Sequence, residues 1–268
     1  MFKKTLSSIL EKNNPKLKKS IKDVYKLKYD VGVLDLENIF LNYFEEKEIL
    51  KLAKKLYKNK DITFDIGYKY FRYIKLKIKK GVFVPQYDTE QIIDIIKNKI
   101  NFGDALEIGS GTGAISISLA SETNIKIDSI DINKKAIKLA KQNDKFKKVN
   151  FINKDFFKFN PTKKYNLIFS NPPYIAKADP YVEDWVKKNQ PKNSLYAKNN
   201  GLLFYEFLFN KIDEFLFYEG YIVLEIGFNQ SADIIKLASK ISHELEVVKD
   251  YSNHDRFVVI KYYGKQNN

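Results

Sequence analysis

Apolar residues in the first part of the chain recur at the spacing of an amphipathic helix. In residues 45–57, Ile49 and Leu52 fall on one face of such a helix. The stretch Asn13-Asn14-Pro15 is a turn signal that separates a first helix from a second. Residues 1–60 are therefore predicted to form a small helical domain.

The spacing changes between residues 63 and 80, where apolar residues alternate with lysines. This period of two predicts a strand or a hairpin. Residues 81–90 contain glycine and proline and are typical of a linker, with Asp88 or Thr89 as the N-cap of the next helix. We thus expect a hairpin and linker over residues 61–90, between the helical domain and the rest of the chain.

From residue 91 onward, short apolar runs alternate with helical patterns. Strands are expected near residues 104–109, 125–131, 149–152, 165–170, 221–226, 245–250 and 256–263, and helices near 113–121, 133–143, 201–217 and 230–241. Alternation of this kind predicts an α/β fold over residues 91–268, with a doubly wound, mostly parallel sheet of seven strands. The last two runs are close together, so we expect an antiparallel hairpin at one edge. The tetrapeptide Leu-Glu-Ile-Gly occurs at 106–109 and again at 224–227, which we interpret as two strand ends under similar constraints.

A glycine-rich segment lies where the first strand of this sheet should turn into a helix: Glu107-Ile108-Gly109-Ser110-Gly111-Thr112-Gly113. Glycines there permit positive φ values and let the backbone approach a ligand closely. Read loosely, the spacing also satisfies a dinucleotide fingerprint, so NAD has to be weighed against S-adenosylmethionine. Glu107 favours the latter, because an acid before the glycines attracts a ligand ammonium and repels a pyrophosphate. Asp131 ends the second strand, where it is placed to accept hydrogen bonds from both ribose hydroxyls.

A further acid and aromatic residue follow the third strand, in Asn153-Lys154-Asp155-Phe156. Asp155 is expected to accept a hydrogen bond from an adenine amine, and Phe156 to pack on the adenine ring. The carboxyl ends of parallel strands meet at one edge of an open sheet, which is where such sheets bind ligands. The sequence therefore predicts one cleft lined by these strand ends.

The fourth strand ends in a rigid tip, Asn171-Pro172-Pro173-Tyr174. The prolines hold φ near −65°, and a residue before proline is held extended. The Asn171 side-chain oxygen and the Pro172 carbonyl are acceptors at a fixed separation, so together they can hold both hydrogens of a planar –NH2 group. Tyr174 adds an aromatic face for stacking or edge packing.

The amino-acid composition argues against a metal site and against a requirement for nucleic acid. The 268 residues include no cysteine and two histidines, so we expect no metal site. The net charge is +14, but only Arg72 and Arg256 are arginines and the lysines spread over the whole length. Because arginine is the better phosphate ligand, we do not expect nucleic acid to be required. No apolar run reaches membrane-spanning length, and we expect a soluble, cytoplasmic monomer.

Taken together, these residues resemble a class I methyltransferase. More narrowly, the chain resembles the HemK/PrmC family of protein-(glutamine-N5) methyltransferases, which modify peptide-chain release factors. The resemblance covers most of the chain and is carried by Gly81-Val-Phe-Val-Pro85, Thr89-Glu90, the glycine loop, Ser170-Asn-Pro-Pro-Tyr-Ile175, Gln190-Pro191, Asn200-Gly201-Leu202, Tyr205, Leu224-Glu-Ile-Gly227, Gln230 and Arg256.

The resemblance implies S-adenosylmethionine as cofactor and methyl transfer to N5 of the glutamine in a release-factor GGQ motif. It also implies that residues 1–60 help to dock the release factor. Three positions depart from the family pattern. Gln86 stands where arginine is usual, Asp255 where glycine is expected, and Glu107 where aspartate is common. The first two bear on substrate docking and leave the methyl-transfer site unchanged.

The predicted site has three overlapping sets. The cofactor set is Glu107, Gly109, Ser110, Gly111, Thr112, Gly113, Asp131, Asp155, Phe156 and Asn171. The substrate set is Asn171, Pro172, Pro173 and Tyr174, and the catalytic set is Asn171, Pro172 and Tyr174.

Two other functions fit parts of the pattern. An adenine-N6 methyltransferase of DNA or RNA would use the same tip, because an exocyclic amine presents the same two donors on a flipped base. Fewer than a hundred residues follow Tyr174, which leaves little room for a DNA target-recognition domain. A catalytically silent binding module is the other alternative, and the intact acidic and tip residues speak against it.

Overall fold

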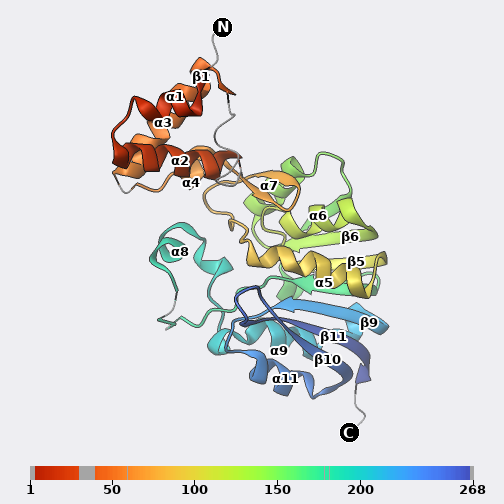
Figure 1. The fold of residues 1–268 in the computed structure, drawn as a ribbon. Coiled ribbons are helices and arrows are strands. Elements are labelled where there is room, and N and C mark those ends of the chain that lie inside the picture. The colour runs from red at the N-terminus through yellow and green to blue at the C-terminus, as the bar shows by residue number, and fades with distance from the viewer. Residues whose placement is uncertain (1–3, 30–39, 59, 178, 181, 266–268) are drawn as a thin grey trace. The chain divides into compact units, whose positions relative to one another are not determined.

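The computed structural model describes residues 4–29, 40–58, 60–177, 179–180 and 182–265 (Figure 1). The chain divides into two compact units, Met1–Tyr70 and Phe71–Asn268. The first unit is mostly helical and the second holds a seven-stranded sheet. The predicted boundaries at residues 60 and 90, and the docking role of the first unit, stay predictions.

The first unit contains α1 (Leu6–Glu11), α2 (Pro15–Tyr29), α3 (Tyr43–Tyr57) and α4 (Thr63–Ile66), with two short paired strands, β1 (Lys4–Thr5) and β2 (Phe40–Leu41). The predicted break is confirmed, since α2 begins at Pro15. Proline suits the first position of a helix, where its missing N–H has no partner to lose. The two strands were not predicted, and residues 30–39 of the expected helical domain lie outside the described residues.

Helix α3 begins with a capping box that the sequence encodes locally. The Asn42 side chain accepts hydrogen bonds from the backbone N–H groups of Phe44 and Glu45, and the Glu45 carboxylate accepts one from the backbone of Asn42. These bonds satisfy amides that a helix start leaves without partners. Ile49 and Leu52 are buried, as the helical spacing predicts.

The predicted hairpin is present as β3 (Tyr68–Phe71) and β4 (Ile74–Lys77). Arg72, in the turn after β3, has a positive φ of 49°. Its guanidinium binds two carboxylates of the same unit, with Nη1 2.7 Å from Asp94 Oδ2 and Nε 2.7 Å from Glu122 Oε1. Bidentate pairs of this kind position a side chain as well as stabilise it.

The prediction of an N-cap at Asp88 or Thr89 is wrong. Asp88–Glu90 form a short 3₁₀ turn, η2, and α5 runs over Gln91–Lys99 without a side-chain cap. The Thr89 hydroxyl is committed elsewhere in the fold, to the side chain of Glu225. The Thr89 side chain therefore binds a residue distant in sequence and does not cap the adjacent helix.

The second unit is built on a sheet of seven strands. They are β5 (Phe102–Ile108), β6 (Asn124–Asp131), β7 (Val149–Asn153), β8 (Tyr165–Ser170), β9 (Leu216–Glu225), β10 (Ile241–Lys249) and β11 (Asp255–Lys265). Their order is β10-β11-β9-β8-β5-β6-β7. The five strands from β9 to β7 are parallel, while β11 is antiparallel to both β9 and β10. The doubly wound sheet and the antiparallel edge pair are both confirmed.

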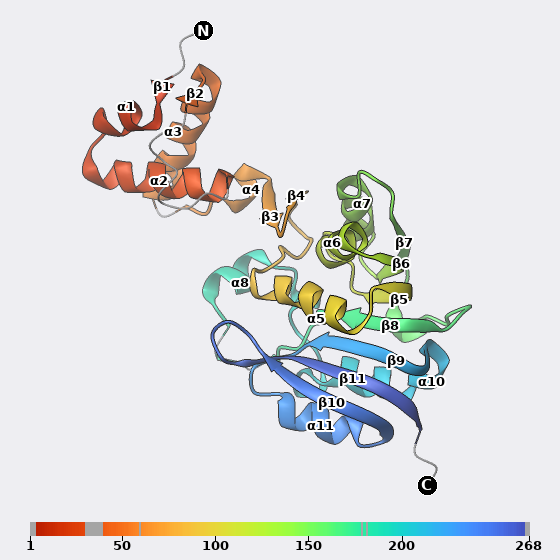
Figure 2. The same ribbon diagram turned by 45° about the vertical axis from the view of Figure 1, so that its right-hand side comes forward.

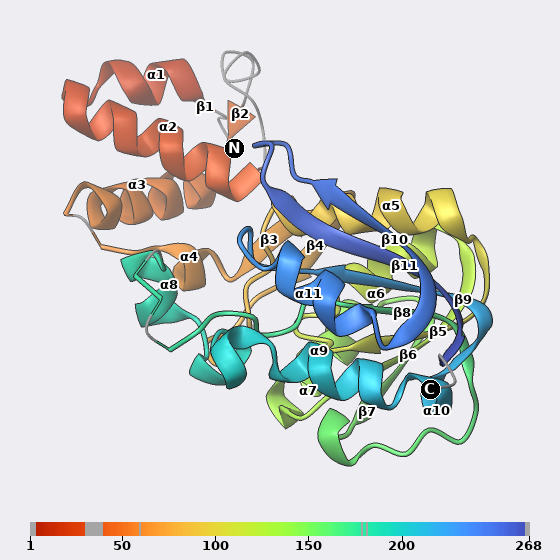
Figure 3. The ribbon, with the colours of Figure 1, turned by 90° about the horizontal axis from the view of Figure 1, so that it is seen from below.

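Helices cover both faces of this sheet, as Figures 1 and 2 show. On one face, α5, α6 (Ala114–Glu122) and α7 (Lys134–Asn143) pack on sheet residues such as Leu167 and Phe169. On the other face, α9 (Leu203–Asn210), α10 (Ile212–Phe215) and α11 (Ser231–Ala238) pack on residues such as Ile168 and Leu224 (Figure 3). Adjacent residues of one strand thus enter different cores, which explains why the parallel strands read as continuous apolar runs.

The predicted helix over residues 201–217 is wrong in its extent. Helix α9 ends at Asn210, α10 is a single turn, and β9 begins at Leu216. The backbone leaves the helical region at Lys211, with φ −113° and ψ 11°. Phe215 and Leu216 are fully buried, so the apolar run that suggested one long helix also serves the start of a strand. In the described part of the chain, every helix is too short or too polar to cross a bilayer.

Candidate active site

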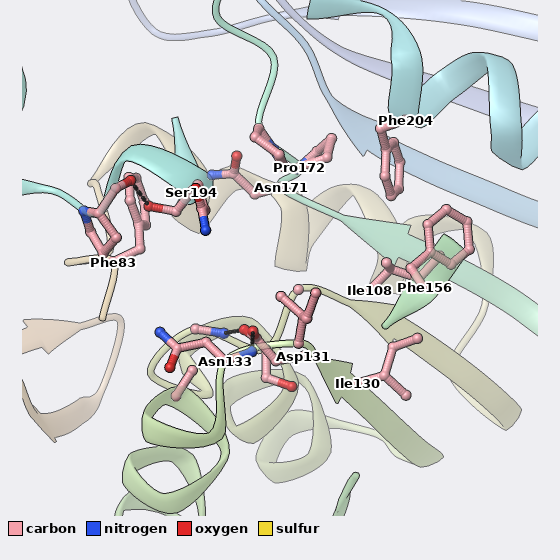
Figure 4. A pocket seen from close by; sticks show the side chains of 18 of the residues that line it. Phe83, Ile108, Ile130, Asp131, Asn133, Phe156, Asn171, Pro172, Ser194 and Phe204 are labelled. Carbon is pink, nitrogen blue, oxygen red and sulfur yellow. Dashed lines mark hydrogen bonds between the residues drawn. The ribbon is translucent and has the colours of Figure 1, made fainter. Parts of the chain in front are cut away.

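A cavity of about 880 Å³ lies at the carboxyl ends of β5, β6, β7 and β8 (Figure 4). Eleven of the predicted site residues line it: Glu107, Gly109, Ser110, Gly111, Thr112, Asp131, Asp155, Phe156, Asn171, Pro172 and Pro173. Asn171 and Asp131 stand across the cavity from each other in the close view, with Phe156 and Phe204 at one end. Gly113 and Tyr174 are not among the lining residues.

All three glycines of the loop have positive φ, and the space that a side chain would meet differs between Gly111 and Gly113. Gly111 has a φ of 52°, and a Cβ there would meet no atom within 4 Å. That space is open, as a ligand site requires. Gly113 has a φ of 81°, and a Cβ would lie 2.8 Å from Ile117 Cδ1. Gly113 is therefore needed for packing of α6, and its predicted contact with the cofactor stays a prediction.

Glu107 is a buried carboxylic acid in the wall of the cavity, with 1% of its surface exposed. Its Oε2 accepts a hydrogen bond from the Ser129 hydroxyl, which in turn lies 2.6 Å from the hydroxyl of Ser110. Oε1 is buried and has no hydrogen-bond partner among the described residues. Burial raises the pKa of Glu107 to about 8, against the lowering effects of the Ser129 hydroxyl and of the side chain and backbone of Ser116. A cation bound at Oε1 would reverse that rise.

Asp131 is held by backbone amides on both oxygens. Oδ2 accepts from the N–H of Gly111 at 2.9 Å, and Oδ1 accepts from the N–H of Asn133 at 2.8 Å. Burial raises the pKa of Asp131, and the two backbone bonds oppose the rise. Each oxygen of an ionised carboxylate can accept a second hydrogen bond, so Asp131 can hold a pair of hydroxyls without giving up either amide.

Asp155 and Phe156 are placed by a short 3₁₀ turn, η3 (Phe156–Lys158). The Asp155 carboxylate caps this turn by accepting from the N–H of Phe157 at 3.0 Å. The Phe156 ring is only 7% exposed and packs against Phe204, with centroids 5.1 Å apart. Both residues line the cavity while serving the fold, and their contacts with adenine stay predictions.

Asn171 has one side-chain hydrogen bond, and it orients the amide. Its Nδ2 donates to Thr89 Oγ1 at 3.0 Å, while Thr89 Oγ1 donates to Glu225 Oε2 at 2.7 Å. The Oδ1 atom of Asn171 accepts no hydrogen bond from the residues that the structure describes. The amide therefore offers a vacant acceptor at the cavity wall.

Tyr174, the last residue of the tip, places its hydroxyl in a polar cluster with Glu225 and Arg256. Its hydroxyl is 3.2 Å from Glu225 Oε1 and 3.4 Å from Arg256 Nη1. Arg256 also pairs with Asp250, with Nε 3.1 Å from Oδ2. The Gln230 amide donates to the carbonyl of Tyr174 at 2.9 Å. These contacts fix the end of the tip from below, and the predicted contact of the Tyr174 ring with substrate stays a prediction.

The cavity offers what S-adenosylmethionine needs. Glu107 Oε1 is an unpartnered acceptor for an ammonium, the backbone at Gly111 leaves open space, and Asp131 has acceptors for two hydroxyls. The carboxylate of Asp131, and that of Glu107 when it is ionised, would repel the pyrophosphate of a dinucleotide. The residues present therefore fit the predicted cofactor.

Comparison with known proteins agrees with this chemistry. A family model described as "Methyltransferase small domain" matches residues 74–190. A release factor glutamine methyltransferase of Buchnera aphidicola is 31% identical over 98% of this chain and 98% of its own length. The chain belongs to the release factor glutamine methyltransferase family. A member from Fusobacterium nucleatum is 38% identical over 80% of this chain, and the match spans 63% of that relative's length.

The fold class predicted for the family is confirmed as well. A methyltransferase from Pyrococcus furiosus superposes with a TM-score of 0.54 at 17% identity, covering 71% of this chain and 89% of its own. At that identity the likeness concerns the fold alone: a class I methyltransferase sheet with helices on both faces.

The departures from the family pattern have local explanations. Gln86 donates from Nε2 to the carbonyl of Val84 at 2.8 Å, so its side chain is used within the loop. Asp255 begins β11 and its carboxylate lies 3.2 Å from Lys249 Nζ. Among the described residues with positive φ, Asp255 does not appear. The backbone there does not require the glycine that the family pattern expects.

The contacts of Thr89 with Glu225 and with Asn171 were not predicted from the sequence, although both Thr89 and Glu225 belong to motifs of the family. The contribution of Phe83, Pro85 and Ser194 to the cavity wall was not predicted either. The second Leu-Glu-Ile-Gly tetrapeptide was the available signal for Glu225. An acid followed by glycine at the end of an apolar strand repeats the arrangement at Glu107.

Proposed function

We propose that this protein transfers a methyl group to the side-chain amide nitrogen N5 of a glutamine in the GGQ motif of a peptide-chain release factor, with S-adenosylmethionine as the methyl donor. The observation that carries the proposal is the orientation of Asn171. Its Nδ2 is taken up by Thr89, and its Oδ1 is left without a partner at the cavity wall. A family relationship over nearly the full length of a release factor glutamine methyltransferase supports the same substrate.

The chain's main chemical task is alignment. An amide nitrogen is a weak nucleophile, and bound S-adenosylmethionine supplies a methyl group that is already electrophilic. Asn171 Oδ1 and the Pro172 carbonyl accept the two hydrogens of the substrate –NH2 and hold the nitrogen in one place. Positioning of this kind contributes several kcal/mol to a barrier. The amide cation formed by attack is acidic, so its proton leaves without a dedicated strong base.

Cofactor binding follows from the acids of the cavity. Glu107 Oε1 accepts from the ammonium of the methionine part, and Asp131 accepts from the two ribose hydroxyls. Asp155 accepts from the adenine amine and Phe156 packs on the ring. Binding of the cation to Glu107 favours the ionised carboxylate, because an opposite charge lowers the pKa that burial raises.

Several finer features of the function belong to the same proposal. The first unit holds the release factor outside its GGQ loop, and glycines beside the glutamine let the loop enter a narrow cleft. The enzyme acts as a cytoplasmic monomer and does not need nucleic acid. An intact release factor is then a far better substrate than a short GGQ peptide.

Mass spectrometry of candidate substrates with methyl-labelled S-adenosylmethionine tests the proposal directly. We expect label on the GGQ glutamine of a purified release factor and none on adenine in DNA or RNA. Asn171→Ala should keep most of its fold and lose about 10²- to 10³-fold in turnover, as expected for one removed positioning group. Robust labelling of adenine, with none on the glutamine, would replace this function by adenine-N6 methylation.

A further inference from the structure

The donor and acceptor roles in the hydrogen bonds between Asn171, Thr89 and Glu225 determine whether the Asn171 amide turns its oxygen or its NH2 group to the cavity. A threonine hydroxyl has one hydrogen to donate and two lone pairs to accept with. Thr89 is 3% exposed, and its hydroxyl lies 2.7 Å from Glu225 Oε2 and 3.0 Å from Asn171 Nδ2. When Glu225 is ionised it can only accept, so Thr89 must donate to it. Thr89 can then only accept from Asn171, whose NH2 turns to Thr89 and whose oxygen is released.

Protonation of Glu225 reverses this order. A neutral carboxylic acid can donate to Thr89, which frees the threonine hydrogen to point at Asn171. The amide of Asn171 would then turn its oxygen to Thr89 and its NH2 to the cavity. Two NH2 groups facing each other cannot form a hydrogen bond, so a substrate amide would lose one of its two acceptors.

We propose that Thr89 and Glu225 are positioning residues that hold the Asn171 amide with its oxygen toward the substrate, and that ionisation of Glu225 sets this orientation. The inference deepens the proposed methyl transfer and rests on it. The hydrogen bonds that link Glu225, Thr89 and Asn171 connect the end of β9, the turn before α5 and the tip after β8. These three segments are far apart in sequence and adjacent in the fold.

The groups around Glu225 place the pKa of its carboxyl close to neutral pH. Burial and the charge of Asp88 raise its pKa, while Thr89, Arg256 and Tyr174 lower it, and the outcome is a pKa of about 7. The Tyr205 hydroxyl donates to the Glu225 backbone carbonyl at 2.8 Å. Asp250 faces Arg256 and not Glu225. The Glu225 carboxyl therefore titrates near neutral pH.

Thr89→Val tests the hydrogen-bond relay from Glu225 through Thr89 to Asn171, since it removes the hydroxyl and keeps the shape of the side chain. With cofactor and release factor saturating, we expect kcat to fall at least about tenfold while the Kd for S-adenosylhomocysteine stays within about twofold. Thr89→Ser restores the hydroxyl and should recover kcat to within about threefold. Thr162→Val, at an exposed position before β8, is the matched control for the same chemical change. Equal kcat for Thr89→Val and wild type would overturn the proposal.

A second readout uses the protein alone and does not depend on the substrate. In ¹⁵N-labelled protein, the Asn171 side-chain NH2 should give resonances that move when Glu225 titrates near pH 7, and that move in Thr89→Val. Fixed Asn171 resonances in both experiments would overturn the relay. If wild type fails to methylate any release factor while these resonances shift as expected, the proposed substrate fails and the relay stands.

Glu225→Gln gives the pH test. The kcat of wild type at saturating cofactor should fall as the pH drops through about 7, because protonated Glu225 favours the wrong Asn171 orientation. Glutamine cannot titrate, so this acidic limb should vanish in the variant, whatever its plateau. An unchanged acidic limb in Glu225→Gln would show that another group controls it and would overturn the role of Glu225. If Thr89→Val does not fold, this comparison still decides.

Discussion

Replacing Glu107 by glutamine should make the cofactor-free protein more stable and bind cofactor more weakly. The carboxyl is 1% exposed, and one of its oxygens has no hydrogen-bond partner among the described residues. Its charged form is therefore poorly solvated until a cation arrives. Glutamine keeps the shape and removes the charge.

The magnitude follows from the pKa of this group. Burial raises the pKa of Glu107 from 4.5 to about 8. A folded-state pKa above the unfolded value means that the folded chain holds the proton more tightly. The contribution to stability is thus fully present below pH 4.5 and is lost as the pH rises through about 8. Each pH unit in that window costs about 1.4 kcal/mol, so the loss between pH 5 and pH 7 is on the order of 3 kcal/mol.

Thermal or chemical denaturation of both proteins from pH 5 to pH 8 measures this difference. The Tm of Glu107→Gln minus that of wild type should increase by roughly 6–12 °C between pH 5 and pH 7. Glu225, another buried acid with a raised pKa, is common to both proteins and cancels in the comparison. A Tm difference independent of pH would refute the reasoning, because it would mean that Glu107 is already ionised in the empty cavity.

Two further predictions concern the same cavity, and a third concerns the packing of Gly201 against Tyr174. Asp131→Ala should weaken binding of S-adenosylhomocysteine by roughly ten- to a hundredfold in calorimetry, since it removes acceptors for the ribose. Binding of S-adenosylhomocysteine to wild type at pH 7 should release protons from Glu107, because the ligand's ammonium lowers a pKa that starts at about 8. The release should shrink above pH 8, and calorimetry in buffers of different ionisation enthalpy measures it. Gly201→Ala should cost at least about 2 kcal/mol of unfolding free energy, since φ is +90° and a Cβ would lie 2.1 Å from the Tyr174 carbonyl oxygen; Gly111→Ala, in open space, should cost less and chiefly weaken cofactor binding.

Much of the fold could be predicted because its signals are local. Parallel strands buried on both faces read as short apolar runs, and the acids and glycines that follow them mark the edge where ligands bind. Glu107, Asp131 and Asn171 were placed on one cavity by that argument alone, and the structure brings them there. The edge pair β10 and β11 was predicted from the short interval between two apolar runs.

Other features depend on tertiary partners that no local pattern records. Thr89 has the sequence context of a helix cap, yet its hydroxyl goes to a carboxylate 136 positions away. Phe156 has the context of a ligand contact, but most of its surface packs on α9 and α10. The break between α10 and β9 falls inside a continuous apolar run, where burial in one core hides the change of period.

The two Leu-Glu-Ile-Gly segments explain how one tip serves two ligands. Strands β5 and β9 lie on either side of β8, so Glu107 and Glu225 end the two strands that flank the tip at Asn171. Both carboxyls are buried and both have raised pKa values, of about 8 and about 7. Buried acids of this kind destabilise a fold as they ionise, and they are kept where a ligand or a reacting group makes use of the charge. Glu107 faces the side of the cavity suited to a cation, while Glu225 reaches Asn171 through Thr89. In the proposed function, Glu107 at the end of β5 binds the methyl donor, Glu225 at the end of β9 orients the Asn171 amide toward the acceptor, and the proline-rigid tip after β8 fixes the position of that amide relative to both.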